Sequence, residues 1–525
     1  MPYTPAPHVT QHWRLAKPAA SGKRGMVVSQ ASAAAEAGVA ILEAGGNAID
    51  AAVATALALA AVEPWNSGLG GIGFAMVHRA GQKRAEVVDF GPKAPRGLDP
   101  SRFPLTGGMK QDLFAWPEVV GDANIHGPLS FAIPSSTAGY AHLLARWGRL
   151  PLAEVIAPAL ALAKRGLPAD WYTTLKVGAS ASVLRRYPES ARIYLPDGLP
   201  PIAPYQGVPG FFRLGRLPDT LEHLARAGLR DFYEGDIARA IVADVAAMGG
   251  VLDGEDLRAC QARMLPVMEV PFGDATLQLT GGLTAAPTLA RVLAAMADVP
   301  LGRIPGAEWF VALARAMKAA YAERLAGLGE AEPNAAETCT THLTACDAEG
   351  TMVAMTSTLL SSMGSRVVLP GTGVLMNNGV MWFDPRPGQP NSIAPGKRPL
   401  TNMLPVIVRR GDAPWIGAGA SGGRRILAAV AQVVSFLGAF GMDVEAAAHH
   451  PRIDVSGPDL VSIDRRMDPA IIAALAADGA VEVVEHGVMP INFACPNAIV
   501  VGSDGVRRGI SDAASPWSAA VAEAG

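Results

Sequence analysis

The run from Glu337 to Asp347 limits the fold of this chain more than any other stretch of its sequence. A polar connector precedes it, and the alternating residues after Thr340 are typical of a β-strand. The chain then turns at Asp347–Gly350 and returns as a second alternating run that ends near Thr358. These runs predict an antiparallel hairpin in which Thr340, at the entrance of the first strand, faces Thr358.

A threonine at such a loop-to-strand junction suits one particular chemistry. If the bond between Cys339 and Thr340 is cut, the Thr340 hydroxyl becomes a nucleophile and the α-amine of the same residue becomes its general base. An α-amine has a reference pKa of roughly 7.7–8, which suits that task near neutral pH. The hydroxyl can also make the cut, by attacking the carbonyl carbon of Cys339 to give an ester that water hydrolyses. The other interpretation is a purely structural strand, because β-branched residues favour strands.

Further motifs lie on both sides of the hairpin. They are Gly45-Gly46-Asn47, Glu63-Pro64, Ser67–Gly71, Pro370–Gly373, Asn377-Asn378, Lys397-Arg398-Pro399 and Gly419–Gly423. Together with Thr340-Thr341-His342 and Thr358, this series resembles the γ-glutamyltranspeptidase family of N-terminal-nucleophile hydrolases, from about residue 25 to residue 520. The resemblance implies an α+β fold, a four-layer αββα sandwich, made as one chain and self-cut into a large subunit 1–339 and a small subunit 340–525.

The resemblance also implies roles for individual residues. Thr340 is the expected nucleophile, and Thr358 is expected to tune its hydroxyl. Gly422 and Gly423 precede a predicted helix, where their N–H groups can point together at an oxyanion. Losing one such donor typically costs about 10²–10³ in rate.

The same glycine segment permits a competing interpretation. Gly419-Ala420-Ser421-Gly422-Gly423 also fits the Gly-x-Ser-x-Gly nucleophile elbow of serine α/β-hydrolases, with His449, His450 and His486 downstream. An α/β-hydrolase has mostly parallel strands, whereas this half of the chain predicts hairpins. The serine hydrolase is therefore kept as an alternative.

The residues that hold the amino-acid head of the substrate in the family are mostly replaced here. Six positions of this chain match those residues. Pro100 matches the family's arginine, Leu360 its asparagine and Gly379 its glutamine. Trp382 matches its aspartate, and Thr401 and Asn402 match its two serines. The family's aspartate faces the substrate's ammonium, and Trp382 at that position has no hydrogen-bond acceptor in its side chain. A shift of the alignment is the other explanation, since Asp384 lies two residues further on.

These replacements predict a substrate without an α-amino group at its head. The expected reaction is hydrolysis of a small carboxylate-bearing amide, oxamate-like or an acyl amide, as in the amidohydrolase-like branch of the family. Leu360, Gly379 and Trp382 are expected to line its site, and Thr401 and Asn402 to hold its anion. Arg102 is the expected partner for that anion, with Arg96 and Arg398 as alternatives. Two further alternatives remain: a γ-glutamyl transferase or glutathione hydrolase with a rearranged head-group site, and an uncut, non-catalytic binding protein.

Composition excludes several other classes of function. The chain has 525 residues, half of them hydrophobic, which is enough for a large core. A net charge of −3 argues against nucleic acid or an acidic membrane surface as the main partner. The four cysteines show no Cys-x-x-Cys pair, so neither a metal nor another cofactor is expected. The expected partners are the small amide and, for each fragment of the cut precursor, the other fragment; the oligomeric state is left open.

The ends and the apolar runs predict a protein that does not cross a membrane. Residues 1–24 lack the apolar core of a signal peptide, so a cytoplasmic location is expected. The longest apolar runs, Ala51–Val62 and Ile426–Met442, are too short to span a bilayer.

Local patterns predict the elements around the hairpin. Helices are expected over Ser32–Ala44 and, capped by Asn47, on to Val62. Gly68–Gly73 fits the dinucleotide pattern Gly-x-Gly-x-x-Gly, but it follows a helix and precedes a predicted hairpin, whereas that motif needs a strand before and a helix after.

The remaining expectations concern the two halves of the chain. Residues 130–335 are predicted to be helical, with an exposed tail over 327–339. The expected strands of the second half are Arg366–Leu369, Val374–Asn377, Leu404–Val408 and Trp415–Gly419, followed by a helix over Arg424–Phe440. His342 shares a strand face with Thr340 and is expected to be a packed, hydrogen-bonded residue, and Cys346 a core residue.

Overall fold

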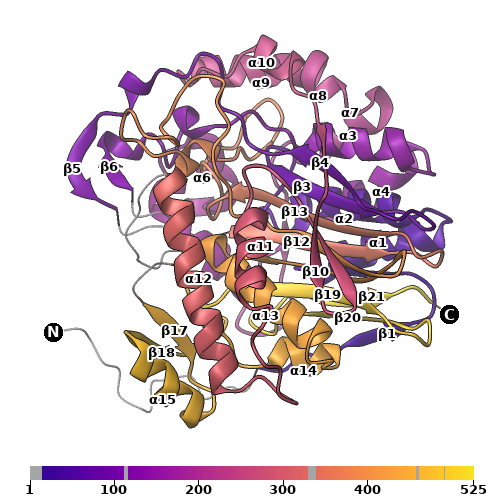
Figure 1. Cartoon of the computed structure of the whole chain (residues 1–525). Coiled ribbons are helices and arrows are strands. Elements are labelled where there is room, and N and C mark those ends of the chain that lie inside the picture. The colour runs from indigo at the N-terminus through magenta and orange to yellow at the C-terminus, as the bar shows by residue number, and fades with distance from the viewer. Residues whose placement is uncertain (1–14, 111–115, 329–338, 457–459, 490, 525) are drawn as a thin grey trace.

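Two antiparallel sheets face each other across the centre of the molecule, with seven strands each in the part of the chain that the structure describes (Figure 1). The computed structural model describes residues 15–110, 116–328, 339–456, 460–489 and 491–524. The first sheet has the order β21 (Ala519–Ala522), β2 (Met26–Ser29), β12 (Cys339–Cys346), β13 (Met352–Leu360), β3 (Ile72–His78), β4 (Glu86–Phe90) and β9 (Arg263–Leu265). The second has the order β1 (Ala20–Gly22), β20 (Arg507–Ser511), β19 (Cys495–Val501), β15 (Ala413–Ser421), β14 (Val406–Arg410), β11 (Ala275–Leu279) and β10 (Met268–Phe272).

Strand alternation divides the side chains of the first sheet between two cores. Cys346 and Met352 point toward the second sheet, where they pack with Ile407 and Ile499. Leu343 and Ala345, on the opposite face of β12, belong to the core under the helices of the first outer layer. Successive strand residues point to opposite faces, so both faces of the sheet are buried. The layers are therefore helix, sheet, sheet and helix, as the resemblance implied.

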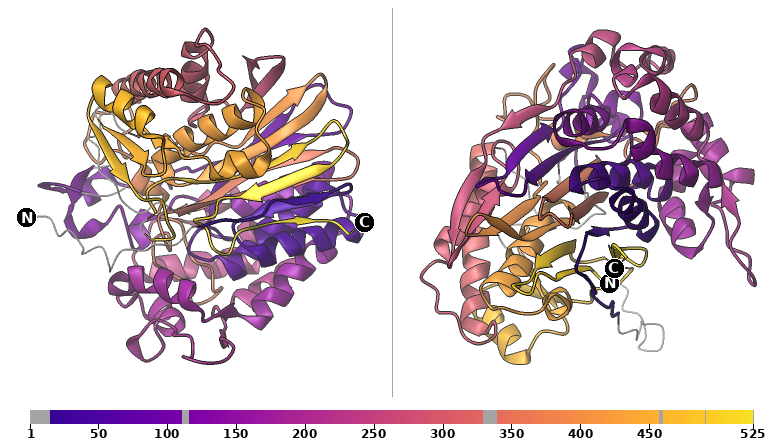
Figure 2. Two further views of the ribbon diagram at one scale, coloured as in Figure 1. Left: turned by 90° about the horizontal axis from the view of Figure 1, so that it is seen from below. Right: turned by 90° about the vertical axis from the view of Figure 1, so that its right-hand side faces the viewer.

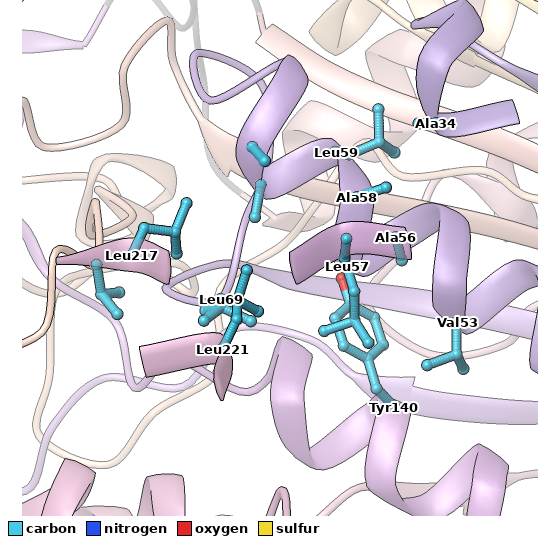
Figure 3. Packing of buried hydrophobic residues seen from close by; sticks show 14 of the residues in the cluster. Ala34, Val53, Ala56, Leu57, Ala58, Leu59, Leu69, Tyr140, Leu217 and Leu221 are labelled. Carbon is cyan, nitrogen blue, oxygen red and sulfur yellow. The ribbon is translucent and has the colours of Figure 1, made fainter. Parts of the chain in front are cut away.

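The two helices next to the first sheet form for reasons visible in the sequence. In α1 (Ser32–Glu43) the apolar residues recur at helical spacing, and α2 (Ala48–Val62) begins at Asn47. The Asn47 side chain accepts from the N–H groups of Ile49 and Asp50, and Asp50 accepts from the N–H of Asn47, which is a capping box. Every residue of α2 is buried. Figure 3 shows Leu57 of α2 beside Tyr140, with Val53 on the same helix, all within one core cluster.

Further helices cover this first layer. They are α3 (Ser136–Trp147), α4 (Leu152–Arg165), α5 (Trp171–Leu184), α6 (Pro188–Tyr194), α7 (Leu217–Ala227), α8 (Asp231–Glu234), α9 (Asp236–Ala247) and α10 (Gly254–Arg258). Short strands β5 (Leu105–Met109) and β6 (Pro117–Val119) pair with each other, as do β7 (Leu167–Pro168) and β8 (Phe211–Phe212).

The second outer layer covers the other sheet (Figure 2). It consists of α11 (Ala286–Ala295), α12 (Ala307–Leu328), α13 (Ile426–Gly438), α14 (Val444–His449) and α15 (Pro469–Asp478). A small sheet of β16 (Ile453–Asp454), β17 (Val461–Asp464) and β18 (Val481–Val484) adjoins it. Both halves of the chain contribute to this layer, since α11 and α12 precede the hairpin and α13 to α15 follow it.

Two expectations about local structure are wrong. The stretch 130–335 is not purely helical, because β9, β10 and β11 lie within it and extend the two sheets. Residues 366–377 form no strand pair but a turn closed by one bridge between Val368 and Leu375. The glycine run at 68–73 follows α2 and runs into β3, as expected, so the strand before it and the helix after it that a dinucleotide site needs are not there. The predicted tail over 327–339 lies largely outside the described residues.

Three findings concern the class of protein. None of the helices in the described part of the chain has the length and apolar character of a membrane span. Cys260, Cys346 and Cys495 are buried free thiols. The described side chains also contain no group of three or more histidine, cysteine, aspartate or glutamate residues placed to hold a metal ion.

Candidate active site

The hairpin of β12 and β13 has the predicted register, with one irregularity at its entrance. Thr341 pairs with Ser357 and His342 with Thr356, but the register shifts between Cys339 and Thr341. Thr340 occupies this bulge, and its side chain is only 5% exposed. A bulge re-aims a side chain at the end of a ladder. The bond between Cys339 and Thr340 therefore lies where regular pairing stops.

Thr358 is in contact with Thr340, as predicted, but as the acceptor of the hydrogen bond. The Thr340 hydroxyl donates to Oγ1 of Thr358 over 3.3 Å. The N–H of Leu360 donates to the same oxygen over 2.7 Å. Since the proton of Thr340 points at Thr358, the lone pairs of the Thr340 oxygen are free to attack a carbonyl carbon.

A small pocket opens at Thr340. Its lining residues all follow Cys339 in the chain, and they are Thr340, Leu360, Trp382, Asn402, Met403, Gly423 and Ile426. The space encloses about 250 Å³, including the part open to solvent. No carboxylate is among these described lining residues, and the polar side chains are those of Thr340, Trp382 and Asn402. The pocket thus offers a hydroxyl, an indole and an amide to a ligand.

The glycine pair after β15 has backbone angles that other residues avoid. Gly422 has φ = 137° and Gly423 has φ = 57°. A short 3₁₀ turn over Gly423–Arg425 leads directly into α13, and no side chain caps either helical start. The first N–H groups of a helix have no partner within it. Because Gly423 and Ile426 line the pocket, these donors lie beside Thr340.

Other predicted substrate contacts do not line the pocket. The Thr401 hydroxyl donates to the carbonyl of Leu283 over 3.0 Å, and Gly379 is buried at the start of the 3₁₀ turn Gly379–Trp382. Arg102 lies exposed on another short turn, Pro100–Arg102. Leu360, Trp382 and Asn402 are the predicted contacts that the structure brings together with Thr340.

The two alternative arginines are held by acidic groups. Arg96 makes ion pairs with Asp253, Glu255 and Asp256. Arg398 lies 3.8 Å from a carboxylate oxygen of Asp89. Neither lines the pocket.

Asp384 does not replace the family's aspartate in the pocket. Its side chain is fully buried and pairs with Arg386, with 2.7 Å between Oδ2 and Nη2. Trp382, not Asp384, forms the wall near Thr340. The alignment shift considered for this segment is therefore not needed to explain the absence of a carboxylate.

His342 is a packed residue, as expected. Its Nδ1 lies 2.9 Å from the Thr356 hydroxyl and its Nε2 lies 3.2 Å from the Thr344 hydroxyl. The ring lies against Gly419 of β15, where an added Cβ would come within 2.3 Å of it. Burial lowers the pKa of His342 to about 3, so the ring is neutral near pH 7.

The serine-elbow interpretation is wrong. Ser421 is at the end of an antiparallel strand and accepts a hydrogen bond from Nε2 of Gln30. The histidines downstream have other partners. His449 forms hydrogen bonds with the backbone of Lys17 and Glu445, and His450 with the backbone of Pro451. His486 forms a hydrogen bond with the carboxylate of Asp512. An α/β-hydrolase needs a parallel sheet and a histidine on the serine.

Two residues near the site were given no role from the sequence, although Glu63 belongs to a motif. Arg324 in α12 is buried and contacts Asn402, and it follows Met317, Ala320 and Tyr321 on the apolar face of that helix. A charged residue on an apolar stripe is a signal that could have identified it. Glu63, at the end of α2, accepts from Nδ2 of Asn66 over 2.7 Å, and burial raises its pKa to about 7. The Thr341 and Asn66 side chains oppose that rise.

Comparison with known proteins agrees with this fold. A family model described as Gamma-glutamyltranspeptidase matches residues 34–339 and 326–522. The acylase ACY 1 proenzyme of Pseudomonas sp. strain SE83 is 31% identical, over 96% of this chain and 94% of that protein. The glutathione hydrolase proenzyme of Escherichia coli K12 is 28% identical, over 93% of this chain and 90% of that protein.

A solved structure has a similar fold. The cephalosporin acylase from Bacillus halodurans aligns with a TM-score of 0.84 at 24% identity, over the whole of both chains. The family model covers most of the chain. This protein therefore belongs to the γ-glutamyltranspeptidase family and is an N-terminal-nucleophile hydrolase.

Proposed function

We propose that this chain is a proenzyme that cuts itself between Cys339 and Thr340 and then hydrolyses a small carboxylate-bearing amide. The observation that carries the proposal is the position of Thr340, at the register shift of β12 and in the wall of a pocket without a carboxylate. The names of two relatives, an acylase proenzyme and a glutathione hydrolase proenzyme, support both the cut and the class of reaction.

The self-cut begins at the Thr340 hydroxyl. Its oxygen attacks the carbonyl carbon of Cys339, the proton passes to the departing nitrogen, and the acyl group moves from nitrogen to oxygen. Water then hydrolyses the ester, which leaves a carboxylate on Cys339 and a free α-amine on Thr340. The two fragments stay together as one heterodimer, because strands from both form each sheet.

The same residue then acts on the substrate. The α-amine takes the proton of the hydroxyl as Oγ1 attacks the amide carbonyl, and gives it to the leaving amine. The N–H groups of Gly422 and Gly423 are the proposed donors to the oxyanion. Water hydrolyses the resulting acyl ester in a second attack, which restores the free threonine. Thr358 holds the hydroxyl in place throughout.

The side chains of the pocket wall favour a substrate whose acyl group has no α-amine. A buried ammonium needs an acceptor, and leaving it without one costs on the order of 3–5 kcal/mol. The indole of Trp382 offers only a donor and a flat apolar surface. A carboxylate or carbonyl oxygen on the substrate would find the N–H donors of Asn402 and Trp382.

A second candidate is a γ-glutamyl transferase or glutathione hydrolase. The similarity to the Escherichia coli glutathione hydrolase proenzyme favours it. The absence of a carboxylate among the described lining residues argues against it.

Competing substrates separate the two candidates. Purified protein is assayed with oxamate, with succinyl and glutaryl nitroanilides, and with γ-glutamyl nitroanilide and glutathione. Our proposal predicts turnover of at least one amide without an α-amine, with kcat/KM about 10² or more above that for the γ-glutamyl anilide. Mass spectrometry of the small subunit after a short exposure should show the acyl group on Thr340. A preference for the γ-glutamyl substrates would favour the second candidate.

A further inference from the structure

A buried arginine of the large-subunit half lies behind the pocket. The Arg324 side chain is 6% exposed, and no carboxylate among the described residues pairs with it. Its Nη1 donates to the carbonyl of Thr284 over 2.9 Å, and its Nη2 to that of Thr401 over 2.6 Å. Burial lowers its pKa to about 10, so the guanidinium is still charged near pH 7. A buried charge held only by neutral groups is costly and therefore calls for a functional explanation.

Nη1 of Arg324 also donates to the Thr288 hydroxyl over 3.3 Å, and a fourth contact fixes a residue of the pocket wall. Its Nη2 donates to Oδ1 of Asn402 over 3.3 Å. A guanidinium has only donors, so the amide oxygen of Asn402 must face the helix and the amide nitrogen must face away from it. No described residue accepts from that nitrogen, and Asn402 lines the pocket beside Thr340. The pocket therefore contains an N–H₂ group in a fixed orientation.

One turn earlier, the same helix reaches the glycine turn. The hydroxyl of Tyr321 donates to the carbonyl of Arg424, the residue that follows Gly423. Residues three apart lie on the same face of a helix, so Tyr321 and Arg324 act from one side of α12. Figure 1 shows α12 as a long helix beside α11 in the outer layer. Its buried face contacts both the proposed oxyanion turn and Asn402.

We propose that Arg324 is a positioning residue that sets the specificity of the site by orienting Asn402 to donate to the far end of the acyl group. The selected substrate is then an amide whose acyl chain ends in a carboxylate. The inference rests on the proposed function, because it concerns the substrate of the Thr340 pocket. It adds that the large subunit determines which acyl group the small subunit accepts.

The test compares two nitroanilides of equal shape. One carries a glutaryl group, and in the other an isopropyl group replaces the terminal carboxylate. The measured quantity is the ratio of their kcat/KM values, with KM and kcat reported separately. In the wild type the glutaryl compound should be favoured by about 10² or more, since the site's polar group is unpaired in the other complex.

Three variants and one control are assayed. Arg324→Met should lower the ratio at least about tenfold, mainly through the KM of the glutaryl compound, and Arg324→Lys should restore part of it. Asn402→Asp should bring the ratio below one, because the new carboxylate pairs with Arg324 and repels the terminal carboxylate of the glutaryl compound. Arg315→Met is the control: Arg315 is on the same helix, exposed, and paired with Asp478, so the ratio should not change.

The outcomes separate this inference from the proposed function. A ratio within about twofold of wild type in Arg324→Met and in Asn402→Asp would overturn the inference while the enzyme remains an amidohydrolase. If Arg324→Met does not fold, Asn402→Asp decides alone, since its isosteric side chain keeps the contact with Arg324. Failure of the cut wild type to hydrolyse either anilide or any amide named above would instead overturn the proposed function.

Discussion

The hydroxyl oxygens of Thr340 and Thr358 lie 3.3 Å apart at the one irregular step of the hairpin that joins β12 and β13. The Leu360 N–H donates to the same Thr358 oxygen, so that oxygen accepts from two sides. The proton of Thr340 is thereby directed toward Thr358. This arrangement is present before any bond of the chain is cut.

Replacing Thr358 with valine removes this acceptor without changing the shape of the side chain. We expect Thr358→Val to slow both self-cutting and amide turnover by about 10- to 100-fold, because a hydrogen bond that holds the nucleophile is lost. The rate of cutting is followed on denaturing gels and turnover with the favoured anilide. Thr356→Val is the matched control, since Thr356 lies on the same strand face but contacts His342 instead. Equal losses in the two variants would contradict the role of Thr358.

The position of His342 predicts a pH effect on stability and none on catalysis. Its folded pKa is about 3, below the ordinary value of 6.5, so the unfolded chain binds the extra proton between these values. Stability should therefore be full above about pH 6.5 and decline as the pH falls, by on the order of 3 kcal/mol at about pH 4. Denaturant unfolding of wild type and His342→Gln measures this; the variant should lack that decline.

The catalytic pH profile is the matching control for His342. The rise of kcat/KM should follow an α-amine of pKa roughly 7.7–8, in the variant as in the wild type. Loss of that rise in His342→Gln would mean that the ring, and not the α-amine, is the base.

Glu63 predicts a change of stability with the opposite sign. Burial raises its folded pKa to about 7 from an ordinary 4.5, so between these values the folded chain holds a proton that the unfolded chain has lost. Its stabilising contribution is present below about pH 4.5 and is lost as the pH rises through 7. Glu63→Gln should lack this loss, which we expect to be on the order of 2–3 kcal/mol between about pH 5 and pH 8. Parallel pH curves for the two proteins would show that Glu63 is ionised in the folded state.

Trp382 is the replacement that bears most directly on the substrate. Trp382→Asp places a carboxylate in the pocket wall, where it can accept from an ammonium. The preference for γ-glutamyl over glutaryl nitroanilide should rise by about 10²–10³. Trp382→Leu is the control for loss of the indole and should not raise that preference. An unchanged preference in Trp382→Asp would mean that the acyl group does not reach this wall.

The sequence predicted those parts of the molecule that depend on local patterns. The hairpin register, the Asn47 cap, the buried helix after it and the strand before Gly422 all follow from spacing and capping residues. The motifs predicted that Thr340, Thr358, Trp382 and Asn402 lie together, and the structure has them at one pocket and one hydrogen bond. What the sequence could not show was which side chains the two sheets bring together.

Arg324 and Arg102 illustrate this limit. Arg102 was expected near the substrate from its place beside a motif, yet it is exposed on a short turn. Arg324 lies far from every motif and meets Asn402 only because α12 packs beside the second sheet. Thr401 was assigned by the same motif as Asn402, but its hydroxyl is used by the carbonyl of Leu283. Pairings between distant segments depend on tertiary packing, which spacing along the chain does not encode.

The most direct test of the account is the intact mass of the purified protein. We predict two polypeptides instead of one of 54.3 kDa, with the smaller beginning at Thr340, and a single uncut, inactive chain for Thr340→Ala. An uncut wild-type chain that hydrolyses amides at full rate, or a Thr340→Ala variant as active as the wild type, would contradict it.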